Sequence, residues 1–169
     1  MPRGLKETSS SIGIGFGIAE TVANTFAQGT IDLNLDPLNQ EVFVVQSINL
    51  DPTPPDAQGG VDSSTRASLT TTSQTGMATL SLANCLATAR LDVRSTAPGE
   101  MVSFTRTSDE SPSTGLEYIG IIATNNFYIQ IQGSSNLAVK SLTGKVYGYR
   151  ARADATIYSA LVSSEVLSA

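Results

Sequence analysis

The side chains best suited to chemistry in this sequence are carboxylates, because the chain contains no histidine. Asp109 and Glu110 form an adjacent pair, but they lie in the stretch TSDESPSTG, where solvated loop charges are expected. The absence of histidine excludes Ser-His-Asp and Cys-His arrangements and imidazole metal ligands. We therefore expect no catalytic residue and no enzymatic activity.

Two other patterns suggest ligand binding and then fail on spacing. Asp32, Asp36 and Asp51 offer oxygen ligands for calcium, but they do not follow the spacing of a calcium-binding loop. The run Gly13-x-Gly15-x-Gly17 resembles the start of a dinucleotide fingerprint, yet residue 18 is isoleucine where a third glycine is required. We expect no metal and no cofactor. The glycines instead indicate a thin extended strip that lies closely on a neighbouring sheet, of the same subunit or another one.

The single cysteine, Cys85, has no partner for an internal disulfide and sits among Leu and Ala residues. We expect a buried, unreactive thiol. Residues 12–18, IGIGFGI, are too short and too rich in glycine for a signal peptide or a membrane span. These features give no support to a secreted, disulfide-linked protein.

Composition predicts one folded domain with an acidic surface. The chain has 169 residues, 40% of them hydrophobic and 15% charged, and a net charge of −5. Its ten Lys and Arg residues are spread along the sequence and indicate no phosphate-binding stripe and no sequence-specific nucleic-acid binding. A small group at Lys145, Arg150 and Arg152 is typical of an edge strand that carries charges against aggregation. We assign residues 1–18 to an extended N-terminal arm and 19–169 to the domain.

The N-terminal third alternates between apolar and other residues, which is typical of half-buried strands. Apolar side chains occupy even positions from Ile12 to Phe26 and odd positions from Ile31 to Leu35. A slip of one residue reverses the faces of a strand, so we expect a bulge or bend at Gly29.

The middle of the chain predicts one strong strand and several weak ones. Residues 41–50, EVFVVQSINL, read as a central strand covered on both faces at one end, and residues 51–60, DPTPPDAQGG, as an exposed loop. Weaker strands are expected at 65–72, 76–82, 89–94 and 100–106. A short helix over 78–91 remains open as an alternative.

The C-terminal third predicts two hairpins and a helix. The first hairpin joins 116–122 to 126–132, and the second joins 137–142 to 145–152 through Thr143-Gly144. Asp154 is expected to cap a short terminal helix. The buried face of this helix would consist of Ile157, Tyr158, Leu161, Val162 and Val166.

Alternation also assigns the faces of the strand at 126–132. Phe127, Ile129 and Ile131 should point into the core, while Gln130 and Gln132 should face solvent or a neighbour. Together these elements predict an all-β protein, a two-sheet β-sandwich of jelly-roll type with eight to ten strands and a possible short C-terminal helix.

The short N-terminal arm, the stretch TIDLNLDPLNQEVFVVQSINLD and the ending SLTGKVYGYRARADATIYSALVSSEVL resemble, in organisation, the single-jelly-roll capsid proteins of tailless icosahedral viruses of bacteria or archaea. The resemblance implies a structural subunit of a virion shell that contacts copies of itself, and it leaves open contacts with a second coat protein and with an internal viral membrane. It implies no catalytic residue. The arm carries just Arg3 and Lys6, so we do not expect it to package nucleic acid by neutralising charge.

Two other classes of protein remain open. One is a carbohydrate- or receptor-binding β-sandwich, although the chain has no Trp to stack on sugars and its five Tyr lie mainly in predicted strands. The other is a subunit of a cell-surface filament or layer. The expected location is the virion, with the cell surface or the extracellular space as the alternative.

Overall fold

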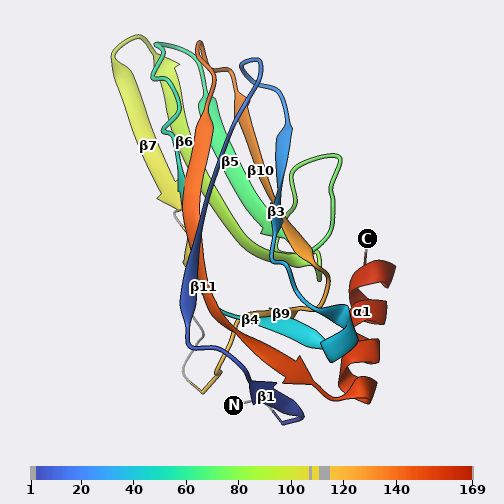
Figure 1. The fold of residues 1–169 in the computed structure, drawn as a ribbon. Helices are drawn as coiled ribbons and strands as arrows, with labels where there is room; N and C mark the ends of the chain where they lie inside the picture. Colours follow the sequence, from blue (N-terminus) through green and yellow to red (C-terminus); the bar gives the residue numbers. More distant parts are fainter. Residues whose placement is uncertain (1–2, 107, 111–114, 169) are drawn as a thin grey trace.

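A computed structural model describes residues 3–106, 108–110 and 115–168, and within them the chain forms a β-sandwich (Figure 1). One sheet contains β1 (Leu5–Glu7), β2 (Ile12–Ala19), β4 (Glu41–Pro52), β8 (Ser108–Glu110), β9 (Gly120–Ile122) and β11 (Ser141–Ala153). The other contains β3 (Ala27–Asp32), β5 (Ser63–Thr70), β6 (Cys85–Ala97), β7 (Glu100–Arg106) and β10 (Asn126–Ser134). A 3-10 turn, Pro37–Asn39, precedes β4, and helix α1 (Ala155–Leu167) follows β11. The predicted all-β sandwich with a C-terminal helix is confirmed.

The order of pairing along the chain is that of a jelly roll. Strand β2 pairs with β11, β3 with β10, β4 with β9 and β5 with β6, all antiparallel. The first of these eight strands thus pairs with the last, the second with the second last, and so on inward. This nested order arises when one long antiparallel ribbon wraps around a barrel, which is the jelly-roll arrangement. Strands β1, β7 and β8 extend the two sheets at their sides.

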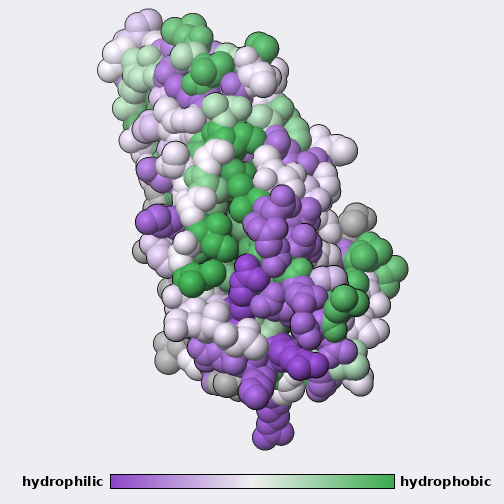
Figure 2. Space-filling model, in the orientation of Figure 1, coloured by the Kyte–Doolittle hydropathy of each residue, from purple (hydrophilic) through white to green (hydrophobic). Residues whose placement is uncertain are grey.

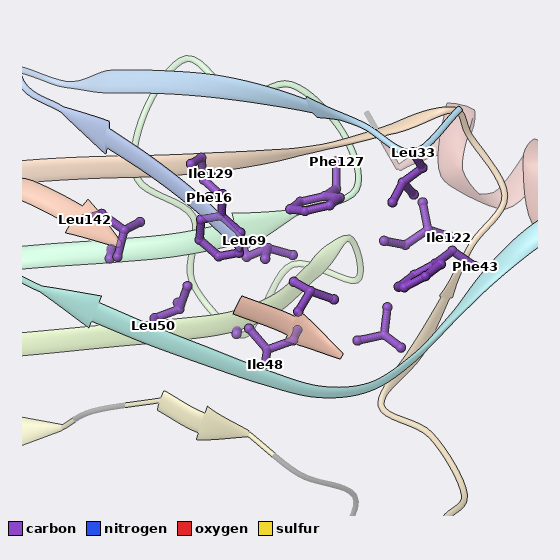
Figure 3. Close-up of a cluster of buried hydrophobic side chains, with 14 of the residues drawn as sticks. Phe16, Leu33, Phe43, Ile48, Leu50, Leu69, Ile122, Phe127, Ile129 and Leu142 are labelled. Carbon is purple, nitrogen blue, oxygen red and sulfur yellow. The ribbon is translucent and has the colours of Figure 1, made fainter. Parts of the chain in front are cut away.

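The main core fills the space between the sheets (Figure 3). The Phe16 ring of β2 meets the Phe127 ring of β10 edge to face, with centroids 5.9 Å apart. Phe127, Ile129 and Ile131 are fully buried in this core, as their alternation predicted. The inward register of β10 is therefore confirmed.

A second core lies on the outer face of the first sheet, beneath α1. Strand β4 contributes Val42 and Val44 to this core, and Phe43 and Val45 to the main core. Its apolar run is thus buried on both faces, as the sequence predicted for a central strand.

Helix α1 begins where expected, because the Asp154 side chain accepts a hydrogen bond from the backbone N–H of Ile157 at 2.8 Å. Four of the five predicted contact residues pack on the second core, namely Ile157, Tyr158, Leu161 and Val162. The expected burial of Val166 is wrong, since its side chain is 63% exposed. The neighbouring Glu165 is buried instead, and its carboxylate accepts hydrogen bonds from the backbone N–H groups of Ala123 and Thr124 at 2.8 and 2.9 Å.

The predicted hairpin at 116–132 is wrong. Strand β9 pairs with β4 in the first sheet, whereas β10 pairs with β3 and β5 in the second. The segment Ala123-Thr124-Asn125 carries the chain from one sheet to the other, and the Glu165 carboxylate holds its backbone. Only residues 120–122 of the first segment form a strand, and the chain that follows crosses the sandwich instead of turning within one sheet.

The second predicted hairpin, at 137–152, is also wrong. Residues 141–153 form one continuous strand, and Gly144 is an interior position of it, opposite both Leu50 and Phe16. The glycine at position 144 is therefore not required by a turn. A Cβ at residue 144 would collide with the backbone O of Asn49 and lie 2.8 Å from the Phe16 ring.

The expected bulge at Gly29 is absent, since β3 pairs with β10 in unbroken register from residue 27 to residue 32. The phase change arises earlier, in the connection at 20–26 that leads from β2 in one sheet to β3 in the other. Val22, placed on the buried face by the alternation, lies in this connection and is exposed.

The weak strands have a mixed outcome. The expected strands at 65–72, 89–94 and 100–106 correspond to β5, part of β6 and β7. Neither the strand at 76–82 nor the alternative helix at 78–91 forms, because this segment is a loop that ends where β6 begins at Cys85. Cys85 is buried, as expected.

The described part of the N-terminal arm is extended and belongs to the first sheet. Strand β1 pairs with the end of β11, and β2 pairs with residues 141–148 of β11. Leu5 is buried in the second core and Phe16 in the main core. The strip of alternating glycines thus lies against a strand of the same subunit.

Candidate interaction surfaces

The acidic residues singled out by the sequence do not come together. Asp32 ends β3, the Asp36 side chain caps the 3-10 turn, and Asp51 lies on β4 opposite Thr143. Among the described residues, no group of three or more carboxylate or cysteine side chains could hold a metal ion. The backbone of residues 108–110 is strand β8, paired with β4, so the loop expected around Asp109 and Glu110 is wrong there. The rest of that stretch, at 107 and 111–114, lies outside the described residues.

Strand β7 is the most exposed element of the sandwich. It pairs with β6 on one side and has no strand beyond it among the described residues (Figure 1). All seven of its residues are exposed, including three large apolar ones: Met101 is 43% exposed, and Val102 and Phe104 are each 57% exposed. Within the described ranges no other segment covers either face of β7, and its outer backbone groups form an unpaired sheet edge.

A second uncovered region follows the opposite side of the sandwich, where β2 and β3 are the outermost strands. Ile12 is exposed, while Ile14 and Ile18 are partly buried against the main core. Apolar atoms run down the middle of Figure 2, in the region where β2 and β11 lie in Figure 1. This strip and β7 leave apolar surface at both sides of the molecule.

Two buried charged side chains, Glu20 and Lys140, and the half-buried Asp56 join the loops at one end of the sandwich, through one ion pair and hydrogen bonds from backbone N–H groups. The Lys140 Nζ lies 2.6 Å from Asp56 Oδ1, and Asp56 Oδ2 accepts hydrogen bonds from the N–H groups of Leu137 and Ala138. The Glu20 carboxylate accepts from the N–H groups of Gly133 and Lys140. The pKa of Asp56 is lowered, first of all by the hydrogen bond from Lys140. This arrangement holds part of the predicted 51–60 loop in place, which indicates a structural role.

Gln130 is completely buried, so its predicted exposure is wrong. Its side chain accepts a hydrogen bond from Ser68 Oγ at 2.7 Å and donates to Thr70 Oγ1 at 2.8 Å and Gln28 Oε1 at 3.1 Å. Gln28 in turn bonds the backbone N–H of Gln74, in the 71–84 loop. The loop covers this part of the outer face of the second sheet, which alternation along β10 alone could not reveal.

The basic residues, spread out in sequence, are partly gathered in space. Arg66 of β5 lies directly opposite Arg90 of β6, and Arg90 lies directly opposite Arg106 of β7. All three line one hollow of about 250 Å³ on the outer face of the second sheet. Arg94 lies on the same face of β6 and pairs with Asp62. Residues that are spread along the sequence thus form a row of basic side chains on this face, which the sequence did not indicate.

The interpretation of Lys145, Arg150 and Arg152 as edge-strand charges is wrong, because β11 has partners on both sides. Arg150 reaches across the sheet, with its guanidinium 3.0 Å from the Glu41 carboxylate and 2.6 Å from the backbone O of Leu33. Its charge serves to fix the segment that leads into β4.

Comparison with known proteins yields distant structural neighbours. No family model matches the chain, and no curated protein matches it in sequence. A chain from desmodium yellow mottle tymovirus is 8% identical, with 88% of this chain and 92% of that chain covered and a TM-score of 0.30. A chain from turnip yellow mosaic virus is 10% identical, with 84% and 94% covered and a TM-score of 0.29.

A host among bacteria or archaea stays a prediction. At these TM-scores the likeness carries no argument about what the chain does. In the part of the chain that the structure describes, no helix is long and apolar enough to cross a membrane.

Proposed function

We propose that this chain is a structural subunit, without catalytic activity, that assembles with copies of itself into a virion shell. The finer features of this proposal are a virus of bacteria or archaea, a possible second coat protein and possible contact with an internal viral membrane. What supports the proposal is the surface of the sandwich, described from its residues.

The observation that carries the proposal is the complete exposure of β7. A strand that is uncovered on both faces and unpaired at one edge usually marks a place where another chain adds, unless charges or prolines protect it. In β7 the exposed side chains include Met101, Val102 and Phe104, and its two charged residues, Glu100 and Arg106, stand at its ends. The middle of the strand is thus open to pairing.

Burial of this strand in an interface would stabilise the assembly in two ways. Apolar area removed from water contributes roughly 25 cal/mol per Å², and the outer backbone groups of β7 would gain partners. The apolar strip on β2 offers a second contact on the opposite side of the subunit. Two separate contacts on one subunit allow closed shells or extended arrays, whereas one self-complementary contact allows dimers alone.

Light scattering and negative-stain microscopy of the purified protein test the proposal. We expect oligomers or particles whose share of the protein rises with protein concentration. A Val102→Lys/Phe104→Lys variant should stay monomeric at the same concentration, because lysines on an edge strand oppose pairing. Leu38→Lys is the matched control, since Leu38 is 91% exposed in the 3-10 turn and lies outside both apolar regions.

Three results distinguish the remaining classes. Closed particles would support a shell, and open filaments or sheets would favour the cell-surface alternative. A 17.6 kDa monomer at every concentration, unchanged by the β7 substitutions, would contradict self-assembly and leave the binding-module alternative.

A further inference from the structure

The row formed by Arg66, Arg90 and Arg106 is an unusual use of charge in an acidic protein. Side chains directly opposite each other on neighbouring strands share a face, with Cβ atoms about 5 Å apart. The three arginines therefore follow one line across β5, β6 and β7, spanning about 10 Å. Like charges in such positions destabilise a sheet. The row is thus not explained by stability of the subunit.

The charge of the row is mostly uncompensated. Arg90 Nε lies 2.5 Å from Asp92 Oδ2, which leaves its two terminal nitrogens available. Within the described part of the chain, no carboxylate lies within ion-pair distance of Arg66 or Arg106. Three positive charges and the one negative charge of Asp92 leave a net charge of two positive units at the row.

The side chains around the arginine row suit a ligand that has an organic part as well as an anionic group. The same hollow of about 250 Å³ is lined by Met77, Leu80 and Thr88, beside the three arginines. Met77 and Leu80 belong to the 71–84 loop, which stands over the outer face of the sheet as a wall. Half of the Leu80 surface is exposed there. The hollow therefore joins an anion-binding row to a small apolar wall.

We propose that this hollow binds phosphate groups, two at a time, through the guanidinium groups of Arg66, Arg90 and Arg106. The planar fork of arginine matches phosphate oxygens and donates two hydrogen bonds to one group. A single carboxylate would leave one positive charge over, whereas two successive phosphodiesters neutralise the two net positive charges and a diphosphate supplies at least as much negative charge. The apolar wall then accommodates the organic part of the ligand. This inference does not depend on self-assembly.

The phosphate groups can come from a free diphosphate compound or from the backbone of a single-stranded nucleic acid. Calorimetric titration with pyrophosphate and with a short mixed-sequence single-stranded DNA, each at low salt, separates the two. Binding of pyrophosphate identifies a small-molecule site, and binding of the oligonucleotide alone identifies a backbone site. In the second case affinity should fall steeply with salt. The logarithm of the association constant should fall against the logarithm of the salt concentration with a slope of about 0.7 for each phosphate contacted.

Substitutions in the row give the decisive comparison. Arg66→Gln/Arg106→Gln should weaken binding of whichever probe binds by more than about tenfold, because each lost charged hydrogen bond costs about that factor or more. The matched control is Lys145→Gln, an exposed cation on the outer face of the other sheet, which should leave binding unchanged. The Arg66→Lys/Arg106→Lys variant keeps the positive charges but loses the planar guanidinium groups that donate two hydrogen bonds. Its affinity should lie between those of the unmodified protein and the glutamine variant.

A folding readout accompanies the titrations. Removal of two like charges from a row should leave the thermal midpoint of the glutamine variant unchanged or raise it. The proposal is overturned if neither probe binds the unmodified protein, or if Lys145→Gln weakens binding as much as the double variant does. It is also overturned if the double variant abolishes self-association while no phosphate probe binds, since the row would then contact an acidic surface of a second copy.

Discussion

Gly144 of β11 approaches the Phe16 ring so closely that a Cβ on residue 144 would lie 2.8 Å from Cζ of that ring. The same Cβ would collide with the backbone O of Asn49 on the other neighbouring strand. We expect Gly144→Ala to lower the free energy of unfolding by about 1–3 kcal/mol, the usual cost of overpacking. Denaturant melts followed by circular dichroism measure it.

Gly15 supplies the matched control for this substitution. It lies on the partner strand β2, one residue before Phe16, and a Cβ there would meet other atoms at 4.0 Å. Gly15→Ala should therefore be neutral or slightly stabilising, because alanine restricts the unfolded chain. Equal losses for the two variants would mean that strand propensity, and not the contact with Phe16, determines the result.

The sequence was sufficient for those elements whose pattern is generated locally. The apolar run at 42–45 is buried on both faces, and Asp154 caps a helix whose spacing matches its contacts with the sheet. Alternation also placed Ile129 correctly. In each case the side chains that determine the pattern belong to one continuous segment.

The errors concern the places where segments distant in the chain meet. Gly144 is required by the Phe16 ring, more than 100 residues away, and not by a turn. The crossing at Ala123 is held by Glu165 of α1. Arg66, Arg90 and Arg106 become neighbours through strand register alone. Spacing along the sequence contains none of these relationships.

Gln130 should be as important to the fold as a core residue, although it is polar. Its side chain makes three hydrogen bonds and is fully buried. Gln130→Ala should cost about 1–3 kcal/mol, since it leaves buried partners without hydrogen bonds, and Ile129→Ala about 2–5 kcal/mol through lost burial and a cavity. The same melts measure both.

Gln132 is the control for Gln130. It lies two residues further along the same face of β10, and its side chain is half-buried. Gln132→Ala should change stability by no more than about 0.5 kcal/mol. If Gln130→Ala were equally mild, the 71–84 loop would not cover this face in solution.

Asp56 should make the stability of the protein depend on pH in acid. Its pKa is lowered in the folded state, chiefly by the hydrogen bond from Lys140, so its contribution is present above about pH 4 and is lost as pH falls through the folded pKa. Asp56→Asn should lower the thermal midpoint at neutral pH, because the buried Lys140 loses its partner. The difference between the two proteins should shrink on acidification.

Asp51→Asn controls for the loss of a carboxylate as such, since Asp51 is exposed on β4. Its midpoint should run parallel to that of the unmodified protein across the same pH range. A constant gap between the unmodified protein and Asp56→Asn down to pH 2 would contradict the coupling to Lys140.

Removal of residues 1–18 should damage the fold, and not just any assembly that uses the strip. The deletion takes away β1 and all of β2 except Ala19, leaves the edge of β11 at 142–148 unpaired, and removes Phe16 from between the sheets. We expect a lower, broader melt than that of the full chain. Phe16→Ala in the full chain should alone cost about 3–5 kcal/mol.

Ile12→Ser separates the two roles of this strip. Ile12 is 39% exposed at the start of β2, so its substitution should leave the melt nearly unchanged and reduce self-association if β2 is a contact between subunits. Circular dichroism and light scattering on the three variants measure the fold and the assembly independently. A truncated protein that keeps a cooperative melt at the original midpoint would show that the strip is dispensable for the sandwich and that its packing on β11 contributes little to stability.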